Sequence, residues 1–125
     1  MDAEAIGDVF RVFGPVRIRR MFGGQGVYRG ELMFALEAYG ELYLKADSES
    51  AELFRNLGSR PFTYTGRDGR TATMSYWLMP ESALDDPDEA AELAHLAFEA
   101  ALRAKAAGSK KGGKASPPRK SPKPA

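Results

Sequence analysis

The chain of 125 residues has room for one domain with a single hydrophobic core. It contains no cysteine, which excludes disulfides, thiolate metal sites and thiol catalysis and favours a reducing, cytoplasmic setting. No apolar run approaches the about 20 residues of a membrane span, and the acidic N-terminal residues do not predict a signal peptide.

The formal net charge of +1 conceals two oppositely charged regions. All 17 acidic residues precede position 108 together with 12 of the 18 basic residues, so residues 1–107 carry a charge of −5. Gly, Ser, Pro, Lys and Ala dominate residues 108–125, a composition typical of disorder. We therefore expect a mildly acidic folded body, residues 1–107, followed by a disordered basic tail, residues 108–125. The tail carries six basic residues and no acidic one: Lys110, Lys111, Lys114, Arg119, Lys120 and Lys123.

The first elements predicted along the chain are a helix and an antiparallel meander. Apolar residues at helical spacing predict a helix over residues 3–13, with Asp2 as its cap. Gly23-Gly24 predicts a sharp corner, and two-residue turns join the later strands, which favours antiparallel pairing. The predicted strands cover residues 16–22, 26–29, 32–38 and 41–46.

Two of these strands carry specific expectations. In residues 16–22, Arg20 falls on the apolar face, so either a bulge near Arg19 turns it outward or it is partly buried against a carboxylate. In residues 32–38, strict alternation places one set of side chains on each face of the sheet. The two sets are Leu32, Phe34 and Leu36 on one face, and Met33, Ala35 and Glu37 on the other.

The second half of the body predicts a short helix, a hairpin and a long helix. A helix over residues 49–57 is expected, capped by Asp47 or Ser48 and ended by Gly58, with Leu53, Phe54 and Leu57 on its apolar face. A hairpin then joins residues 62–65 and 71–78 through Asp68-Gly69, and Pro80 ends it. Asp86-Pro87-Asp88-Glu89 predicts the start of a helix that runs to about Ala107. The expected fold class is α+β: two layers, with helices packed mainly on one face of an antiparallel sheet.

No pattern in the body predicts catalysis, a cofactor or a metal. Gly23-Gly24-x-Gly26 is followed by a strand and not by Lys-Ser or Lys-Thr, so it predicts a turn and not a phosphate cradle. His95 is expected to be solvated or half-packed on a helix, and nothing around Ser75 resembles a nucleophile elbow. Tyr76 and Trp77 are expected to pack on opposite sheet faces. An acidic cluster is expected to complement a helix dipole and not to bind a cation: Glu81, Asp85, Asp86, Asp88, Glu89 and Glu92.

Two basic features indicate partners. Arg17, Arg19, Arg20 and Arg29 form the basic cluster of the body, either solvated and paired or contacting phosphate or an acidic partner. The six tail cations predict salt-sensitive, sequence-independent contact with DNA or RNA, the alternative being a merely solubilising tail.

The run Arg19-Arg20-Met21-Phe22-Gly23-Gly24-x-Gly26-Val27-Tyr28 resembles the hallmark of the TfoX/Sxy N-terminal domain family. Phe62-x-Tyr64, Tyr76-x-x-Met79-Pro80 and the closing helix also resemble that family, over about residues 5–105. Proteins of this family are known as regulators of natural competence that act with the cyclic-AMP receptor protein. The resemblance implies a two-layer, secretion-chaperone-like domain without assigned catalytic residues. Full-length regulators carry a second, helical domain where this sequence has its basic tail.

Three functional interpretations follow. The first is a non-enzymatic regulatory or adaptor domain that contacts a protein partner, with a tail that adds nonspecific affinity for nucleic acid. The second is a small-molecule-binding protein or minor enzyme, with a pocket near Arg19, Arg20, Tyr28, Tyr43 and Trp77. The third is a homodimer formed through a sheet face or edge. The expected interaction surface consists of the motif residues Arg19, Arg20, Met21, Phe22, Gly23, Gly24, Gly26, Tyr28, Tyr76, Trp77, Met79 and Pro80.

Overall fold

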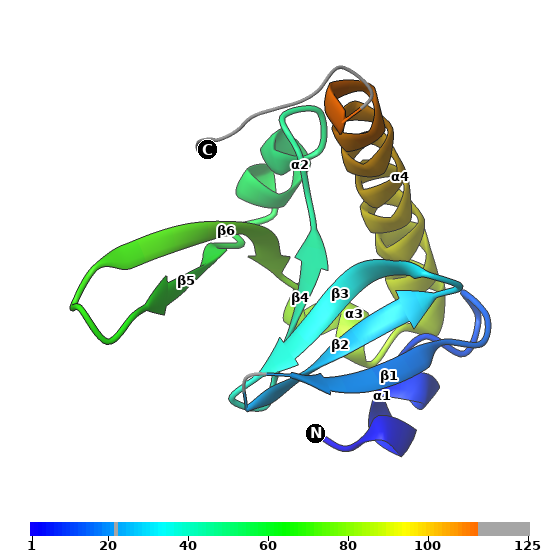
Figure 1. Ribbon diagram of the computed structural model, residues 1–125. Coiled ribbons are helices and arrows are strands. Elements are labelled where there is room, and N and C mark those ends of the chain that lie inside the picture. The colour runs from blue at the N-terminus through cyan, green and yellow to red at the C-terminus, as the bar shows by residue number, and fades with distance from the viewer. Residues whose placement is uncertain (22, 113–125) are drawn as a thin grey trace.

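The computed structural model describes residues 1–21 and 23–112 (Figure 1). Six strands form one sheet in the order β1-β2-β3-β4-β6-β5, and every neighbouring pair is antiparallel. The fold is therefore α+β with an open antiparallel sheet, as the sequence predicts. In chain order the elements are α1 (Ala3–Val9), β1 (Arg17–Met21), β2 (Gly24–Arg29), β3 (Leu32–Ala38), β4 (Glu41–Lys45), α2 (Ala51–Asn56), β5 (Pro61–Thr65), β6 (Thr71–Leu78), α3 (Glu81–Leu84) and α4 (Pro87–Gly112).

The main core lies between the sheet and the helices. Phe34 of β3 is fully buried, and its ring packs against those of Phe10 and Phe13, with centroids 5.3 and 5.0 Å away. Helix α4 presents small side chains to the sheet, and four of its alanines are fully buried: Ala90, Ala94, Ala97 and Ala100. Small residues allow the helix axis to lie close to β3 and β4, as Figure 1 shows for α4 behind the sheet.

A bulge in β3 overturns the predicted alternation of that strand. Val27 pairs with Ala35 and Tyr28 with Met33, so Phe34 between them has no partner on β2. Phe34 and Ala35 therefore both belong to the helix-side core, whereas Met33 joins a separate apolar cluster. One extra residue shifts the side-chain parity of a strand. The prediction that Phe34 and Leu36 share a face is wrong, because Leu36 lies with Met33.

The helices differ from prediction mainly at their ends. Asp2 caps α1 as expected, since its Oδ1 accepts from the Ala5 amide at 2.9 Å, but the helix ends at Val9 and residues 10–13 form a turn. Asp86 begins α4 as expected, because its carboxylate accepts from the amides of Asp88 and Glu89. The short α3 was not predicted. Helix α4 extends to Gly112 and not to about Ala107, and residues 113–125 of the predicted tail lie outside the described residues.

Helix α2 is shorter and less amphipathic than expected. Phe54 is fully buried, but Leu53 and Leu57 are 39% and 47% exposed, so the predicted apolar face reduces to a single anchor. Asp47 caps the turn that precedes the helix, where its Oδ1 accepts from the amides of Glu49 and Ser50. No helix of the described residues combines the length and apolar character needed to cross a membrane.

Candidate interaction surface on the open sheet face

The glycine-rich motif forms the corner between β1 and β2, and each glycine has its own physical reason. Gly23 adopts φ +79°, which favours glycine. A Cβ on Gly24 would lie 2.2 Å from the backbone oxygen of Glu37, so no side chain fits there. A Cβ on Gly26 would lie 2.7 Å from Met33 Sδ and 3.0 Å from Met21 Sδ, so this glycine makes room for two methionines. The structure confirms the turn interpretation of this motif.

The sheet face opposite the helices carries its own apolar cluster. Its buried members are Leu36, Tyr43 and Tyr76, and its partly buried members are Met33, Ala38, Phe62 and Leu78, all of them from strands. The rings of Tyr43 and Phe62 meet at 4.9 Å, and burial raises the pKa of Tyr76 to about 12. This sheet therefore has apolar residues on both faces, and among the described residues helices cover one of them.

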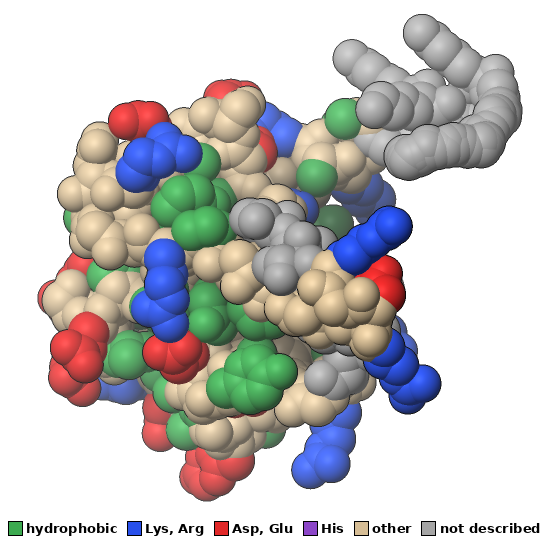
Figure 2. Space-filling view, turned by 90° about the vertical axis from the view of Figure 1, so that its left-hand side faces the viewer, with side chains coloured by type: hydrophobic (Ala, Val, Ile, Leu, Met, Phe, Trp, Pro, Cys, Tyr) green, Lys and Arg blue, Asp and Glu red, His purple; other side chains and the backbone are tan. Residues whose placement is uncertain are grey.

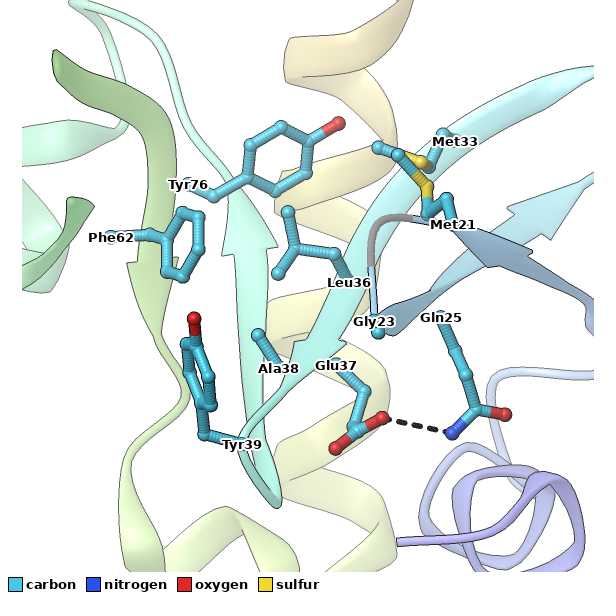
Figure 3. Close-up of a pocket in the computed structure, with 11 residues that line it drawn as sticks. Met21, Gly23, Gln25, Met33, Leu36, Glu37, Ala38, Tyr39, Phe62 and Tyr76 are labelled. Atoms are coloured by element: carbon cyan, nitrogen blue, oxygen red, sulfur yellow. Dashed lines mark hydrogen bonds between the residues drawn. The ribbon is translucent and has the colours of Figure 1, made fainter. Parts of the chain in front are cut away.

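A hollow of 280 Å³, called the groove below, opens on this face next to the glycine corner. Figure 3 shows Tyr76 and Phe62 projecting from the β5–β6 side and Met21 and Met33 from the β1–β3 side, with Leu36 between them. Apolar side chains thus form its floor. The residues that line the groove are Met21, Gly23, Gly24, Gln25, Met33, Leu36, Glu37, Ala38, Tyr39, Phe62 and Tyr76.

Cations stand on the same face as the groove. Arg17 and Arg19 of β1 lie 5.1 and 5.9 Å from the centroid of the Tyr28 ring. Lys45 of β4 lies 5.2 Å from the Tyr76 ring and donates to Ser75 Oγ at 2.7 Å, and partial burial lowers the pKa of Lys45. Figure 2, viewed from the side of the β5–β6 hairpin, shows hydrophobic side chains (green) reaching the surface between Lys and Arg side chains (blue).

The predicted arginine cluster is divided between the two sides of the sheet. Arg29 faces the helices, where its guanidinium lies 3.7 Å from the centroid of the Phe13 ring and donates to the Phe13 carbonyl. Arg20 is exposed beside Met1 and forms no ion pair with any described residue. Strand β1 pairs with β2 without a register shift, so there is no bulge at Arg19. Both explanations offered for Arg20 are wrong, because β1 has no bulge there and the side chain is exposed without a carboxylate partner among the described residues.

A buried carboxylate, which the sequence did not reveal, holds the motif and the β3–β4 turn together. Glu37 is only 7% exposed and accepts from Gln25 Nε2 and from the Gly40 amide, both at 2.8 Å. Its Oε2 also lies 3.9 Å from the N-terminal ammonium, and Gln25 donates to the Met1 carbonyl (Figure 3 shows the pair of Glu37 and Gln25). The signal available in the sequence was an acidic residue just before a two-residue turn, where its side chain can accept a turn amide.

The alternative pocket predicted from sequence does not form around its five residues. Tyr43 lies on the open face, whereas Trp77 packs against the helix-side core and beneath Arg55 at 5.4 Å. Of that set, Arg19 and Tyr28 are brought together, as described above. The groove instead uses Met21, Phe62 and neighbours that the pocket prediction did not name.

The remaining residues of the predicted site either pack within the fold, away from the groove, or lie outside the described residues. Met79 is buried in the helix-side core, Pro80 precedes α3, and His95 is exposed with its ring 5.0 Å from that of Phe13. The described residues contain no cluster of ligands suited to a metal. Lys110 and Lys111 fall within α4. Outside the described residues or side chains lie Phe22, Tyr64, Lys114, Arg119, Lys120 and Lys123.

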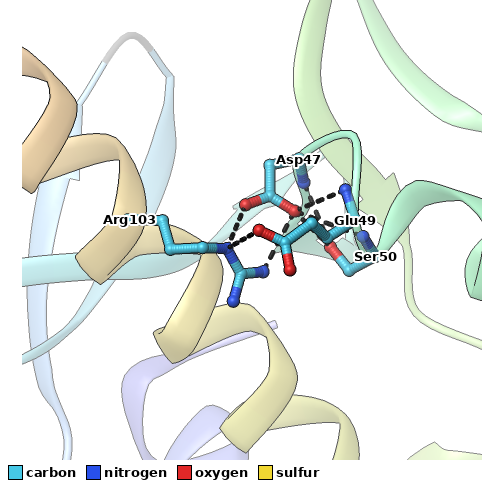
Figure 4. Close-up of polar contacts among 4 residues, drawn as sticks. All are labelled: Asp47, Glu49, Ser50 and Arg103. Carbon is cyan, nitrogen blue, oxygen red and sulfur yellow. Dashed lines mark hydrogen bonds and ion pairs between the residues drawn. The ribbon is translucent and has the colours of Figure 1, made fainter.

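A polar cluster on the other side of the molecule fixes α4 to the segment before α2 (Figure 4). Arg103 donates from Nε to Asp47 Oδ2 at 2.6 Å and from a terminal nitrogen to Oδ1 at 3.1 Å. Glu49 Oε2 lies 3.2 Å from the same Nε. The guanidinium of Arg103 is the main reason that the pKa of Asp47 falls to about 2. The cluster is therefore a structural clamp.

This clamp predicts a loss of stability in acid. Because the pKa of Asp47 is lower in the folded chain than the ordinary 3.8, its contribution is complete at neutral pH and disappears as the pH falls from about 5 to about 2. Because this pair is partly exposed, we expect it to contribute about 1 kcal/mol to the free energy of unfolding. Urea unfolding at pH 7 and pH 3 should show that Asp47→Asn removes this part of the pH dependence. The control, Asp8→Asn, changes an exposed carboxylate and should leave the pH dependence of unfolding unchanged.

The comparisons with known proteins agree with this arrangement. The TfoX N-terminal domain matches residues 8–101, which include the glycine corner and the whole sheet. Protein Sxy of Escherichia coli (strain K12) is 29% identical over 92 residues, which cover 74% of this chain and 44% of Sxy. The chain thus spans less than half the length of that relative. This protein belongs to the TfoX N-terminal domain family.

Proposed function

We propose that this protein is a non-enzymatic regulatory or adaptor domain that contacts a protein partner in the control of DNA transformation competence. The observation that carries the proposal is the second apolar face of the sheet, where the partly exposed Met21, Met33 and Phe62 line the groove. Exposed apolar surface of this kind is typical of protein contacts. Family membership supports the regulatory role, and the site of action we infer is the bacterial cytoplasm, where transcription takes place.

The polar groups around the groove support a binding role over a catalytic one. Glu37 and Gln25 are engaged in holding the turn and the N-terminal residues, and Lys45 is held by Ser75 and the Tyr76 ring. A general acid or base needs a free proton-transfer position near a substrate. The bonds of these groups instead stiffen the walls of an apolar hollow.

The regulatory role is tested by deletion in the native bacterium. Loss of the protein should lower the transcripts of DNA-uptake genes and the transformation frequency, both by about tenfold or more. Complementation with the full chain should restore both. Unchanged transcripts and transformation would show that the protein does not act in competence.

We propose further that the basic tail adds nonspecific affinity for nucleic acid. Removing residues 113–125 deletes four cations, Lys114, Arg119, Lys120 and Lys123. If all four contact duplex phosphates, the magnitude of the slope of log K against log salt should fall by about 3.6. Fluorescence anisotropy with a duplex oligonucleotide measures this slope. A full-length variant with the same four residues changed to Gln separates charge from chain length, and equal slopes for all three chains would refute the tail's role.

A further inference from the structure

The β3–β4 turn keeps an aromatic side chain in an unfavourable place. Tyr39 has φ +56° and Gly40 has φ +82°, so both central residues of this two-residue turn are left-handed. Asn, Asp or Gly is favoured at such a position, and a bulky aromatic residue is costly there. The Tyr39 side chain is nevertheless 88% exposed and lines the groove. An exposed, strained aromatic side chain is typical of a contact residue and not of a folding requirement.

The turn that carries Tyr39 is also held rigidly. The buried carboxylate of Glu37 accepts from the Gly40 amide at 2.8 Å and from Gln25 at 2.8 Å. Figure 3 shows Tyr39 standing at one end of the groove, opposite Met21 and Met33. The backbone that carries Tyr39 is therefore already fixed before a partner binds, so binding does not have to order the turn.

The charged side chains around the groove indicate the charge that a partner carries. Arg17 and Arg60 already have carboxylate partners, Glu31 at 3.8 Å and Glu41 at 3.2 Å. Arg19 and Lys45 form no ion pair with any described residue, and they stand on the β1 and β4 sides of the open face. An apolar floor between two cations that form no ion pair with a described carboxylate complements apolar side chains flanked by carboxylates.

We propose that the groove binds an amphipathic helix of a protein partner, with acidic residues on both margins of its apolar stripe. This inference rests on the proposed function and names the chemistry of the partner. Helices cover the other apolar face of the same sheet, and a helix of the partner would complete the second layer. Met21 and Met33 supply adaptable side chains suited to the leucines of such a helix.

The other occupants fit the groove less well. In a symmetric contact between two grooves, a second copy of the chain would bring the same cations, Arg19 and Lys45, to the interface. The chain's own tail is basic and would be repelled by them. Nucleic acid has the charge to pair with the cations. Its phosphates, however, would lose their hydration against the apolar floor of Met21, Met33 and Leu36 without gaining hydrogen bonds there. Each of these occupants is an outcome that the experiment can detect.

The test uses labelled peptides of about 18 residues, or five helical turns, and the full chain. The first peptide has leucines at i, i+3, i+4 and i+7 flanked by glutamates. The second replaces every glutamate by lysine, and the third has the composition of the first in scrambled order. Fluorescence anisotropy should show that the first binds about tenfold or more tightly than either control. Equal affinity for the lysine peptide or the scrambled peptide would overturn the inference.

Three variants locate the binding. Tyr39→Asn should weaken binding of the acidic peptide by about tenfold while raising the melting temperature, because asparagine suits the turn. Arg19→Glu should weaken binding of the acidic peptide similarly. It should also reduce the difference in affinity between the acidic peptide and the lysine peptide. Arg11→Glu, an equivalent charge reversal after α1, should leave binding unchanged. Binding unaffected by both Tyr39→Asn and Arg19→Glu would place the peptide elsewhere and overturn the inference.

Competition and sedimentation cover the remaining occupants. A single-stranded oligonucleotide that displaces the acidic peptide from the chain lacking residues 113–125 would reassign the groove to nucleic acid. Concentration-dependent dimerisation abolished by Tyr39→Asn would reassign it to a second copy. If no peptide binds as expected but deletion of the protein still lowers transformation, only this inference is removed. Peptide binding without a competence phenotype removes only the proposed function.

Discussion

Replacing Gly24 by alanine should unfold the protein or lower its free energy of unfolding by about 3 kcal/mol or more. The new Cβ would lie 2.2 Å from the backbone oxygen of Glu37 and 3.4 Å from its carbonyl carbon, and neither atom can rotate away. Relief requires separation of the start of β2 from the end of β3, which breaks the pairing of Gln25 with Glu37. Urea unfolding followed by circular dichroism measures the loss.

Two other glycines provide matched controls for Gly24→Ala. Gly23→Ala meets no atom within 4 Å but has φ +79°, so it should cost about 1 kcal/mol. Gly7→Ala also meets no atom and lies within α1, so it should stabilise the chain by about 0.5–1 kcal/mol. If Gly24→Ala costs no more than Gly23→Ala, the close approach of β2 to Glu37 does not exist in solution.

Truncating Phe34 to alanine should cost about 3–5 kcal/mol, the largest loss we expect from a side-chain deletion in the core. Phe34 is fully buried, and its ring contacts Phe10 and Phe13 across the layer between sheet and helices. The surrounding elements cannot close the space, because the bulge fixes the position of this residue on β3. Thermal and urea unfolding measure the loss.

Val12→Ala is the control for Phe34→Ala, since Val12 is 54% exposed and close in sequence to the same cluster. It should change the free energy of unfolding by less than about 0.5 kcal/mol. A loss below about 1 kcal/mol for Phe34→Ala would contradict the burial of this ring between the sheet and the helices.

Local chemistry was sufficient to predict the order and type of most elements. The two-residue links fixed antiparallel neighbours, and Asp86 with Pro87 marked the start of α4. The position of Trp77 opposite Tyr76 followed from the period of two along β6. These features depend on residues next to one another in the chain, and no distant contact opposes them.

The candidate site was predicted only in part, because the groove depends on contacts between distant segments. The bulge at Phe34 moves Met33 and Leu36 to one face, and no local pattern signals it. The buried state of Glu37 depends on Gln25 and Met1, which lie far from it in sequence. The exposure of Arg20 was likewise not predicted, because the alternation along β1 places it on the same face as Ile18. Patterns in a single sequence do not show which of these distant segments come into contact.

The length of α4 separates the two regions of the chain for which contacts are proposed. Its 26 residues span about 39 Å, and Figure 1 shows its C-terminal end beside α2, away from the turn that joins β3 to β4. The proposed contacts with a polyanion, after Gly112, and with a polypeptide, at Tyr39, are therefore attached at separate places in the fold. The covalent link would raise the local concentration of each near the other, to the millimolar range typical of short tethers. If both proposed contacts form, the protein acts as a bivalent connector.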